Sequence, residues 1–107
     1  MKRINVKPLS VNQVWQGKRF KTKKYKDYEK TVLSILPNLK IPEGNLKLVL
    51  TFGFSSKLSD WDNPIKPLQD ILQKKYNFND SRVFKAEVEK VIVKKGKEFI
   101  EFSIESL

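Results

Sequence analysis

Two aspartates lie two residues apart near the centre of the chain, in the segment Ser59-Asp60-Trp61-Asp62-Asn63. In an extended segment, the side chains of Asp60 and Asp62 point the same way. Two carboxylates so close repel each other unless a cation or a proton lies between them. Carboxylate oxygens suit Mg²⁺, or alternatively Mn²⁺, so the pair predicts a divalent metal site. The alternative is structural, because an aspartate before Asn-Pro is also an ordinary helix cap.

Three further charged residues follow the pair. Lys66 comes four residues after Asp62, and Asp70 lies one helical turn beyond Lys66. A lysine at this place could stabilise negative charge on a phosphate, or it could be a solvated partner of Asp62 or Asp70. Asp80 could complete a metal site if the chain folds back, or it could be a turn aspartate.

The residue types that are missing narrow the chemistry. The chain contains no cysteine and no histidine. Thiolate metal sites, disulfides, histidine triads and the usual neutral-pH proton shuttle are therefore excluded. Any catalysis must come from carboxylates, lysine and a metal bound through oxygen.

The positive charge is concentrated in the first third of the chain. Residues 1–40 hold 11 of the 22 basic residues but only two of the 12 acidic ones, and the net charge of the chain is +10. Such asymmetry favours a surface that faces a polyanion, most simply a nucleic acid. The alternative is a solvated face that aids solubility.

The elements that position these residues follow from hydrophobic periodicity. We expect one domain over residues 1–107, an α/β (α+β) fold with a small mixed sheet, two helices and the order β-α-β-α-β-β. The expected elements are a short strand around Ile4 and Val6, a loop at 8–21, a helix at 22–36, a strand at 46–54, a helix at 63–76, and a hairpin of strands 83–94 and 97–104 that turns at Lys95-Gly96.

Apolar stripes define the predicted core. Thr22 is the expected N-cap of the first helix, and Pro64 suits the first position of the second. The stripes consist of Tyr25, Tyr28, Val32, Ile35 and Leu36 in the first helix, and of Ile65, Leu68, Ile71, Leu72 and Tyr76 in the second. Trp61 is expected to turn away from the aspartates and pack.

The combined motif resembles the RusA-type Holliday junction resolvases. The pattern D-x-D-N-x-x-K-x-x-x-D, followed by D-S-x-V, reads here Asp60, Asp62, Asn63, Lys66, Asp70, Asp80, Ser81 and Val83. The opening Pro8-Leu9-Ser10-Val11-Asn12 resembles the family's P-x-S-x-N segment, and Gly17-Lys18-Arg19-Phe20 also fits. Many relatives carry two successive acids in the last motif, whereas here Asn79 precedes Asp80.

The resemblance implies a metal-dependent endonuclease that cuts four-way DNA junctions as a homodimer. It implies Asp60, Asp62 and Asp80 as metal ligands and Lys66 as the essential lysine. Asp70, Asn63 and Asn79 are expected to support these residues. The basic residues expected to hold the DNA backbone are Lys18, Arg19, Lys21, Lys23, Lys24 and Lys26. Trp15, Phe20 and Tyr25 lie near them; core packing is favoured for Tyr25, while Trp15 could either stack on DNA or pack.

Other interpretations stay open at this point. They are a basic DNA- or RNA-binding module with structural aspartates, a degenerate dimeric family member, and a nuclease for flaps or forks. The charged start and the lack of a long apolar run favour a cytoplasmic protein without membrane contact. No small-molecule cofactor is expected, and a phage or prophage origin follows only from the resemblance.

Overall fold

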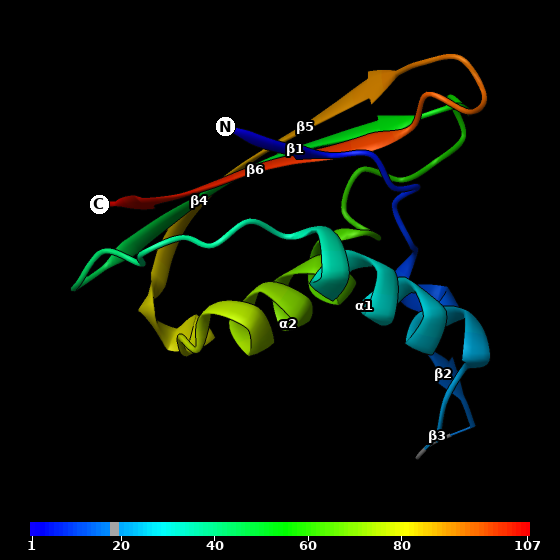
Figure 1. Ribbon diagram of the computed structural model, residues 1–107. Helices are drawn as coiled ribbons and strands as arrows, with labels where there is room; N and C mark the ends of the chain where they lie inside the picture. The colour runs from blue at the N-terminus through cyan, green and yellow to red at the C-terminus, as the bar shows by residue number, and fades with distance from the viewer. Residues whose placement is uncertain (18–19) are drawn as a thin grey trace.

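The computed structural model describes residues 1–17 and 20–107, and it shows two helices under one face of a four-stranded sheet (Figure 1). The sheet has the order β1-β6-β4-β5 and is mixed, because β5 runs parallel to β4 while β6 runs antiparallel to both β4 and β1. The α+β architecture with a small mixed sheet and two helices is thereby confirmed. Within the described residues, no helix is long and apolar enough to cross a membrane.

Strand β4 (Leu46–Phe54) lies inside the sheet, between β5 and β6. Its bounds agree with the prediction, and its leucines and phenylalanines are buried at every second position. These side chains face the helices, since the residues between them, such as Val49 and Thr51, are only half-buried. The alternating pattern in the sequence therefore identified the helix-facing surface of this strand correctly.

The predicted hairpin of the last two strands is wrong. Strands β5 (Val83–Ile92) and β6 (Phe99–Ser106) are both present, but they flank β4 instead of pairing with each other. The connection at 93–98 crosses the end of β4, where Val93 N–H donates to the carbonyl of Phe54. Strand β4 is long and its apolar side is buried, so β5 and β6 each pair with β4 in preference to each other. A turn signal in the sequence reports only on the local chain and cannot reveal this preference.

Helix α1 (Lys23–Ile35) begins as expected, because the Thr22 hydroxyl accepts a hydrogen bond from Tyr25 N–H. Tyr25, Tyr28 and Val32 are buried against the sheet. The prediction that Ile35 belongs to the buried stripe is wrong, since this side chain is 43% exposed. Leu36, the C-cap residue, is buried.

Helix α2 (Ile65–Tyr76) starts two residues later than predicted, with Pro64 at the N-cap position. Its predicted stripe is confirmed for Leu68, Ile71 and Leu72, which are fully buried. The C-cap residue Asn77 adopts a left-handed conformation, which turns the chain sharply at the end of the helix. A polar contact links the two helices. Glu29 of α1 accepts hydrogen bonds from Tyr25 of the same helix and from Lys74 of α2.

The N-terminal region contains more structure than the loop predicted for residues 8–21. After β1 (Lys2–Ile4) the chain forms a short 3₁₀ helix, η1 (Val11–Gln13). Strands β2 (Trp15–Gln16) and β3 (Phe20–Lys21) then pair as a small ribbon away from the main sheet (Figure 1). These strands have two residues each, too few for a periodic signal in the sequence.

Phe99 and Gly53 meet on the face of the sheet away from the helices. Phe99 is buried there beneath the guanidinium of Arg3, which lies 4.0 Å from the ring centroid. A Cβ atom on Gly53 would lie 2.4 Å from two ring atoms of Phe99. Glycine is therefore required at this position because the ring occupies the space of a side chain.

We expect Gly53→Ala to lower the free energy of unfolding by about 1–3 kcal/mol, as overpacked sites do. Urea unfolding followed by circular dichroism measures the loss. In a Phe99→Leu background the same change should cost less, because the smaller side chain leaves room. An equal loss in both backgrounds would show that the ring contact is not the cause.

Candidate active site

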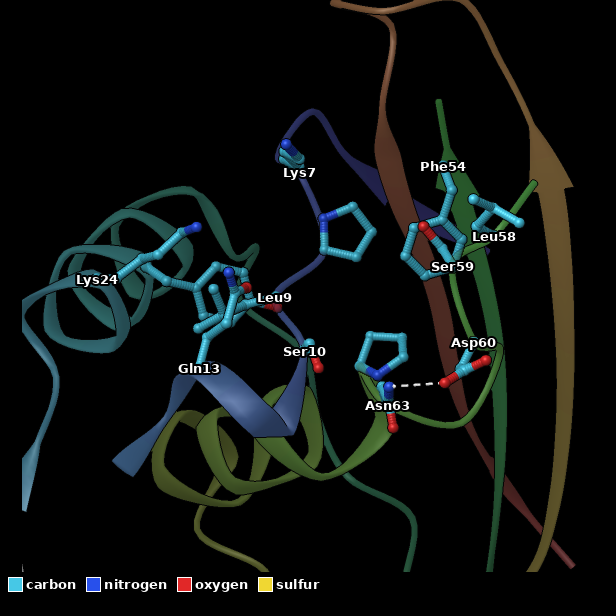
Figure 2. Close-up of a pocket in the computed structure, with 13 residues that line it drawn as sticks. Lys7, Leu9, Ser10, Gln13, Lys24, Phe54, Leu58, Ser59, Asp60 and Asn63 are labelled. Atoms are coloured by element: carbon cyan, nitrogen blue, oxygen red, sulfur yellow. Dashed lines mark hydrogen bonds between the residues drawn. The ribbon is translucent and has the colours of Figure 1, made fainter. Parts of the chain in front are cut away.

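The loop that leaves β4 carries the first two aspartates of the motif. Asp60 accepts a hydrogen bond from the side-chain amide of Asn63 at 3.2 Å, and the carboxylate is exposed (Figure 2). The carbonyl of Asn63 accepts a hydrogen bond of 2.8 Å from Val11 N–H. The N-terminal segment 8–12 is thus held directly against the acidic loop, although about fifty residues separate the two in the chain.

Asp62 does not cap helix α2 with its side chain. The cap position belongs to Pro64, which provides no side-chain hydrogen bond, and Asp62 contributes only its carbonyl to the N–H of Ile65. The carboxylate of Asp62 is exposed and available for another role. Trp61 is also exposed, by 55%, so the prediction that it packs is wrong.

Lys66 lies in the first turn of α2 and forms an ion pair of 2.9 Å with Asp70. The carboxylate of Asp70 raises the pKa of Lys66 and outweighs the opposing effect of burial, and the charge of Asp80 raises it further. Since the ordinary pKa is already 10.5, the ammonium group stays protonated at neutral pH. Lys66 can therefore offset negative charge but cannot serve as a general base at that pH.

Asp80 lies beside α2 because the chain folds back after the end of this helix. The side-chain amide of Gln69, in the middle of α2, lies 3.5 Å from a carboxylate oxygen of Asp80. Asn79 forms the N-cap of the 3₁₀ helix η2 (Asp80–Arg82), with its side-chain oxygen accepting from Ser81 N–H at 2.8 Å. Asn79 thus fixes the backbone at Asp80, a task that an aspartate in the same place would perform equally well.

The donor atoms suit a hard cation in kind, since Asp60, Asp62 and Asp80 offer exposed carboxylate oxygens. However, within residues 1–17 and 20–107 no three acidic side chains lie close enough together to hold a metal ion. The metal-binding role of the three aspartates therefore stays a prediction.

Lys90 is a contributor to this site that the sequence analysis missed. From strand β5 its ammonium group donates hydrogen bonds to the carbonyls of Lys57, at 3.1 Å, and Ser59, at 2.7 Å. The carbonyl of Ser59 immediately precedes Asp60, so Lys90 fixes the loop where the acids begin. A signal was present, because Lys90 pairs with the buried Phe52 and interrupts the apolar positions Val88 and Ile92 on the helix-facing side of β5.

The basic residues near the start of α1 are only partly free to bind a ligand. Lys23 forms an exposed ion pair with Asp27 at 2.9 Å, and Lys21 lies over the ring of Tyr25 at 4.6 Å. Lys24 and Lys26 are exposed. Lys18 and Arg19, the other two members of the predicted cluster, lie outside the described residues.

The three aromatic residues of this region differ in burial. Tyr25 is buried in the core, which confirms the packing role favoured for it. Trp15 and Phe20 lie on the β2–β3 ribbon and are 51% and 73% exposed. Their exposure leaves both rings available for stacking beside the basic residues.

A pocket of about 400 Å³ lies next to Asp60 and Asn63 (Figure 2). The segment 7–10 and helix α1 form one side, while the end of β4 and the loop after it form the other. It is the place where the N-terminal segment, the basic helix and the acidic loop meet. Each of these three parts is apparent in the sequence, but the space that they enclose is not.

We expect Lys90→Met to loosen the acidic loop without unfolding the protein, because the change removes two hydrogen bonds from a charged donor. Hydrogen exchange of the amides at 57–63 should accelerate by about tenfold. Lys94→Met is the matched control, since no hydrogen bond or ion pair of its side chain is found within the described residues. Equal exchange in the two variants would contradict the role given to Lys90.

The chain was also compared with known proteins. No curated protein sequence matches it at a significant level. The family model for endodeoxyribonuclease RusA, however, matches residues 6–103, which includes the N-terminal segment, both helices and every aspartate described above. The chain therefore belongs to the RusA endodeoxyribonuclease family.

Proposed function

We propose that this chain is a homodimeric, Mg²⁺-dependent endonuclease that resolves four-way DNA junctions. Enzymes of its family are Holliday junction resolvases and depend in general on a divalent metal. The observation that carries the proposal is the family match itself, which spans the acidic loop, Lys66 and Asp80. We further propose that residues 1–107 act as one nuclease domain. A cytoplasmic location and a phage or prophage origin stay predictions.

Asp60, Asp62 and Asp80 are the residues that would hold the ion, with Mn²⁺ as the alternative to Mg²⁺. A divalent ion, when bound, supplies polarisation of a phosphoryl oxygen and a lowered pKa of its water. Lys66, held by Asp70 and kept protonated, offsets the charge that builds on the scissile phosphate. Lys90 and Asn63 hold the loop so that Asp60 keeps its position when the DNA binds.

The basic face of α1 is suited to the DNA backbone. Lys24 and Lys26 carry no ion pair among the described residues, and together with Lys21 and Lys23 they can contact phosphates without reading sequence. Trp15 and Phe20 are exposed on the neighbouring ribbon. There they could stack on the unstacked bases that a DNA branch point exposes. Binding of this kind weakens steeply as salt increases.

The dimer proposal rests on the family resemblance and on strand β5. This ten-residue strand is at the edge of the sheet and, within the described residues, pairs only with β4. It exposes Phe84 by 65% and Ile92 by 43%. An edge strand with exposed apolar side chains is a natural place for a second copy, and a two-fold dimer matches the near two-fold symmetry of a four-way junction.

We expect the wild-type protein to make paired, symmetric nicks in a synthetic four-way junction in Mg²⁺ and none in EDTA. Asp62→Asn should bind the junction normally but cut it more slowly, on the order of a hundredfold or more. Gel assays of binding and single-turnover cutting measure both quantities, with flap and linear duplex substrates run in parallel.

Glu43→Gln, an acid-to-amide change at an exposed loop position, is the control and should cut like the wild type. Cutting of the junction in EDTA would contradict the metal-dependent mechanism. A wild-type protein that binds but never cuts would favour the binding module or the degenerate family member. Preferential cutting of flaps would keep the nuclease and change its substrate.

We expect Phe84→Glu to yield a folded monomer, because a carboxylate in an apolar interface is costly to bury. Ile35→Glu, on α1, introduces the same charge at another exposed apolar position and should leave a dimer intact. Analytical ultracentrifugation gives the two masses. A monomeric wild type, or a dimeric Phe84→Glu variant, would contradict an interface at β5.

A further inference from the structure

The pocket beside Asp60 has both polar and apolar lining residues. Its volume of about 400 Å³ lies within the range of small-ligand sites. Leu9, Phe54 and the rings of Pro8 and Pro64 supply apolar surface. The polar lining comes from Ser10, Gln13, Ser59, Asn63 and the two lysines Lys7 and Lys24. Such a lining suits a flat, partly polar molecule that carries negative charge at one end.

Tyr28 lines this pocket, and its hydroxyl group is buried. The oxygen is shielded from solvent and makes no hydrogen bond within the described residues. Burial raises the pKa of Tyr28 well above its ordinary range, so the group stays a neutral donor. An unpaired buried hydroxyl is unfavourable in the free protein. A small shift of the pocket wall would bring this hydroxyl into reach of a ligand, and a ligand that accepts its hydrogen bond would remove that cost.

The charges around the pocket are ordered in space. Lys7 and Lys24 lie at the end of the pocket where the N-terminal segment approaches α1, and Asp60 lies at the opposite side (Figure 2). The ammonium groups can hold a phosphate, while Asp60 belongs to the loop that bears the acids of the nuclease motif. A molecule in the pocket therefore lies between a phosphate-binding end and the proposed cutting site.

We propose that the pocket receives the base of one unpaired nucleotide of the DNA substrate, with Tyr28 as hydrogen-bond donor and with Lys7 and Lys24 on its phosphates. This inference rests on the proposed function and deepens it, because it names what the enzyme recognises in a branch. A base in linear duplex is stacked and paired, so its removal into a pocket is costly. At a branch point that cost is smaller. The pocket thus gives a physical reason for preferring branched DNA.

The test uses the protein of residues 1–107 in EDTA, so that binding is measured without cutting. A set of four-way junctions is prepared, each with one abasic site, so that every position within two nucleotides of the exchange point is tested. At one position we expect the missing base to weaken binding by the wild type by about tenfold, the size of one lost base contact. Equal affinity for all these junctions would overturn the proposal.

Two variants at Gln13 test the location of the contact. Gln13 is exposed on the rim, and its backbone carbonyl, which accepts from Thr22, is kept in any substitution. Gln13→Trp should block the pocket, bind the intact junction about tenfold more weakly and lose no more when the base is missing. Gln13→Ala, which leaves the pocket open, should still distinguish intact from abasic junctions. Loss of base dependence in both variants, or in neither, would overturn the proposal.

Tyr28→Phe tests the hydroxyl and is safe for folding, because it removes only an unpaired polar atom. We expect an unchanged or higher melting temperature together with weaker binding of the intact junction and unchanged binding of the abasic one. Wild-type affinity for the intact junction would overturn the assigned donor. A protein that shows the base dependence in EDTA but cuts nothing in Mg²⁺ would refute the proposed function and keep the pocket.

Discussion

The fixing of the loop between β4 and α2 is the constraint on which the rest of the site depends. This loop carries two exposed carboxylates and buries little apolar surface, so its own packing cannot hold it in one conformation. Lys90 holds it from the sheet side through the carbonyls of Lys57 and Ser59, and Val11 holds it from the other side through the carbonyl of Asn63. All three carbonyls are backbone atoms, so these contacts hold the loop without occupying the carboxylates of Asp60 and Asp62.

This arrangement explains why the N-terminal segment belongs to the same motif as the aspartates. The segment contributes no acid, yet it holds Asn63 and forms one wall of the pocket through Pro8, Leu9 and Ser10. The Thr22 hydroxyl then ties Gln13 to the start of α1, which brings the basic helix to the other wall. A chain of hydrogen bonds thus joins the basic third of the sequence to the acidic loop.

Local patterns in the sequence predicted what depends on local physics. The bounds of β4, the Thr22 cap and the buried centre of the α2 stripe, Leu68, Ile71 and Leu72, follow from periodicity and capping, and all are observed. The pairing of β5 with β4 instead of β6, the exposure of Ile35 and the role of Lys90 depend on which elements become neighbours. The motif located the acids in the sequence, but the pocket exists only because three distant segments meet.

The electrostatics of the molecule act at two scales. Over the whole chain the net charge is +10, which attracts DNA and falls off over a Debye length of about 10 Å. Near α2 the charges alternate locally, because Lys66 forms an ion pair with Asp70 and the charge of Asp80 acts on it as well. A small cation close to the acids experiences mainly the field of these nearby charges. An extended polyanion such as DNA experiences the field of the whole protein. Because the ion pair with Asp70 holds the Lys66 ammonium group, the contact proposed for it with the scissile phosphate would be made from a fixed position.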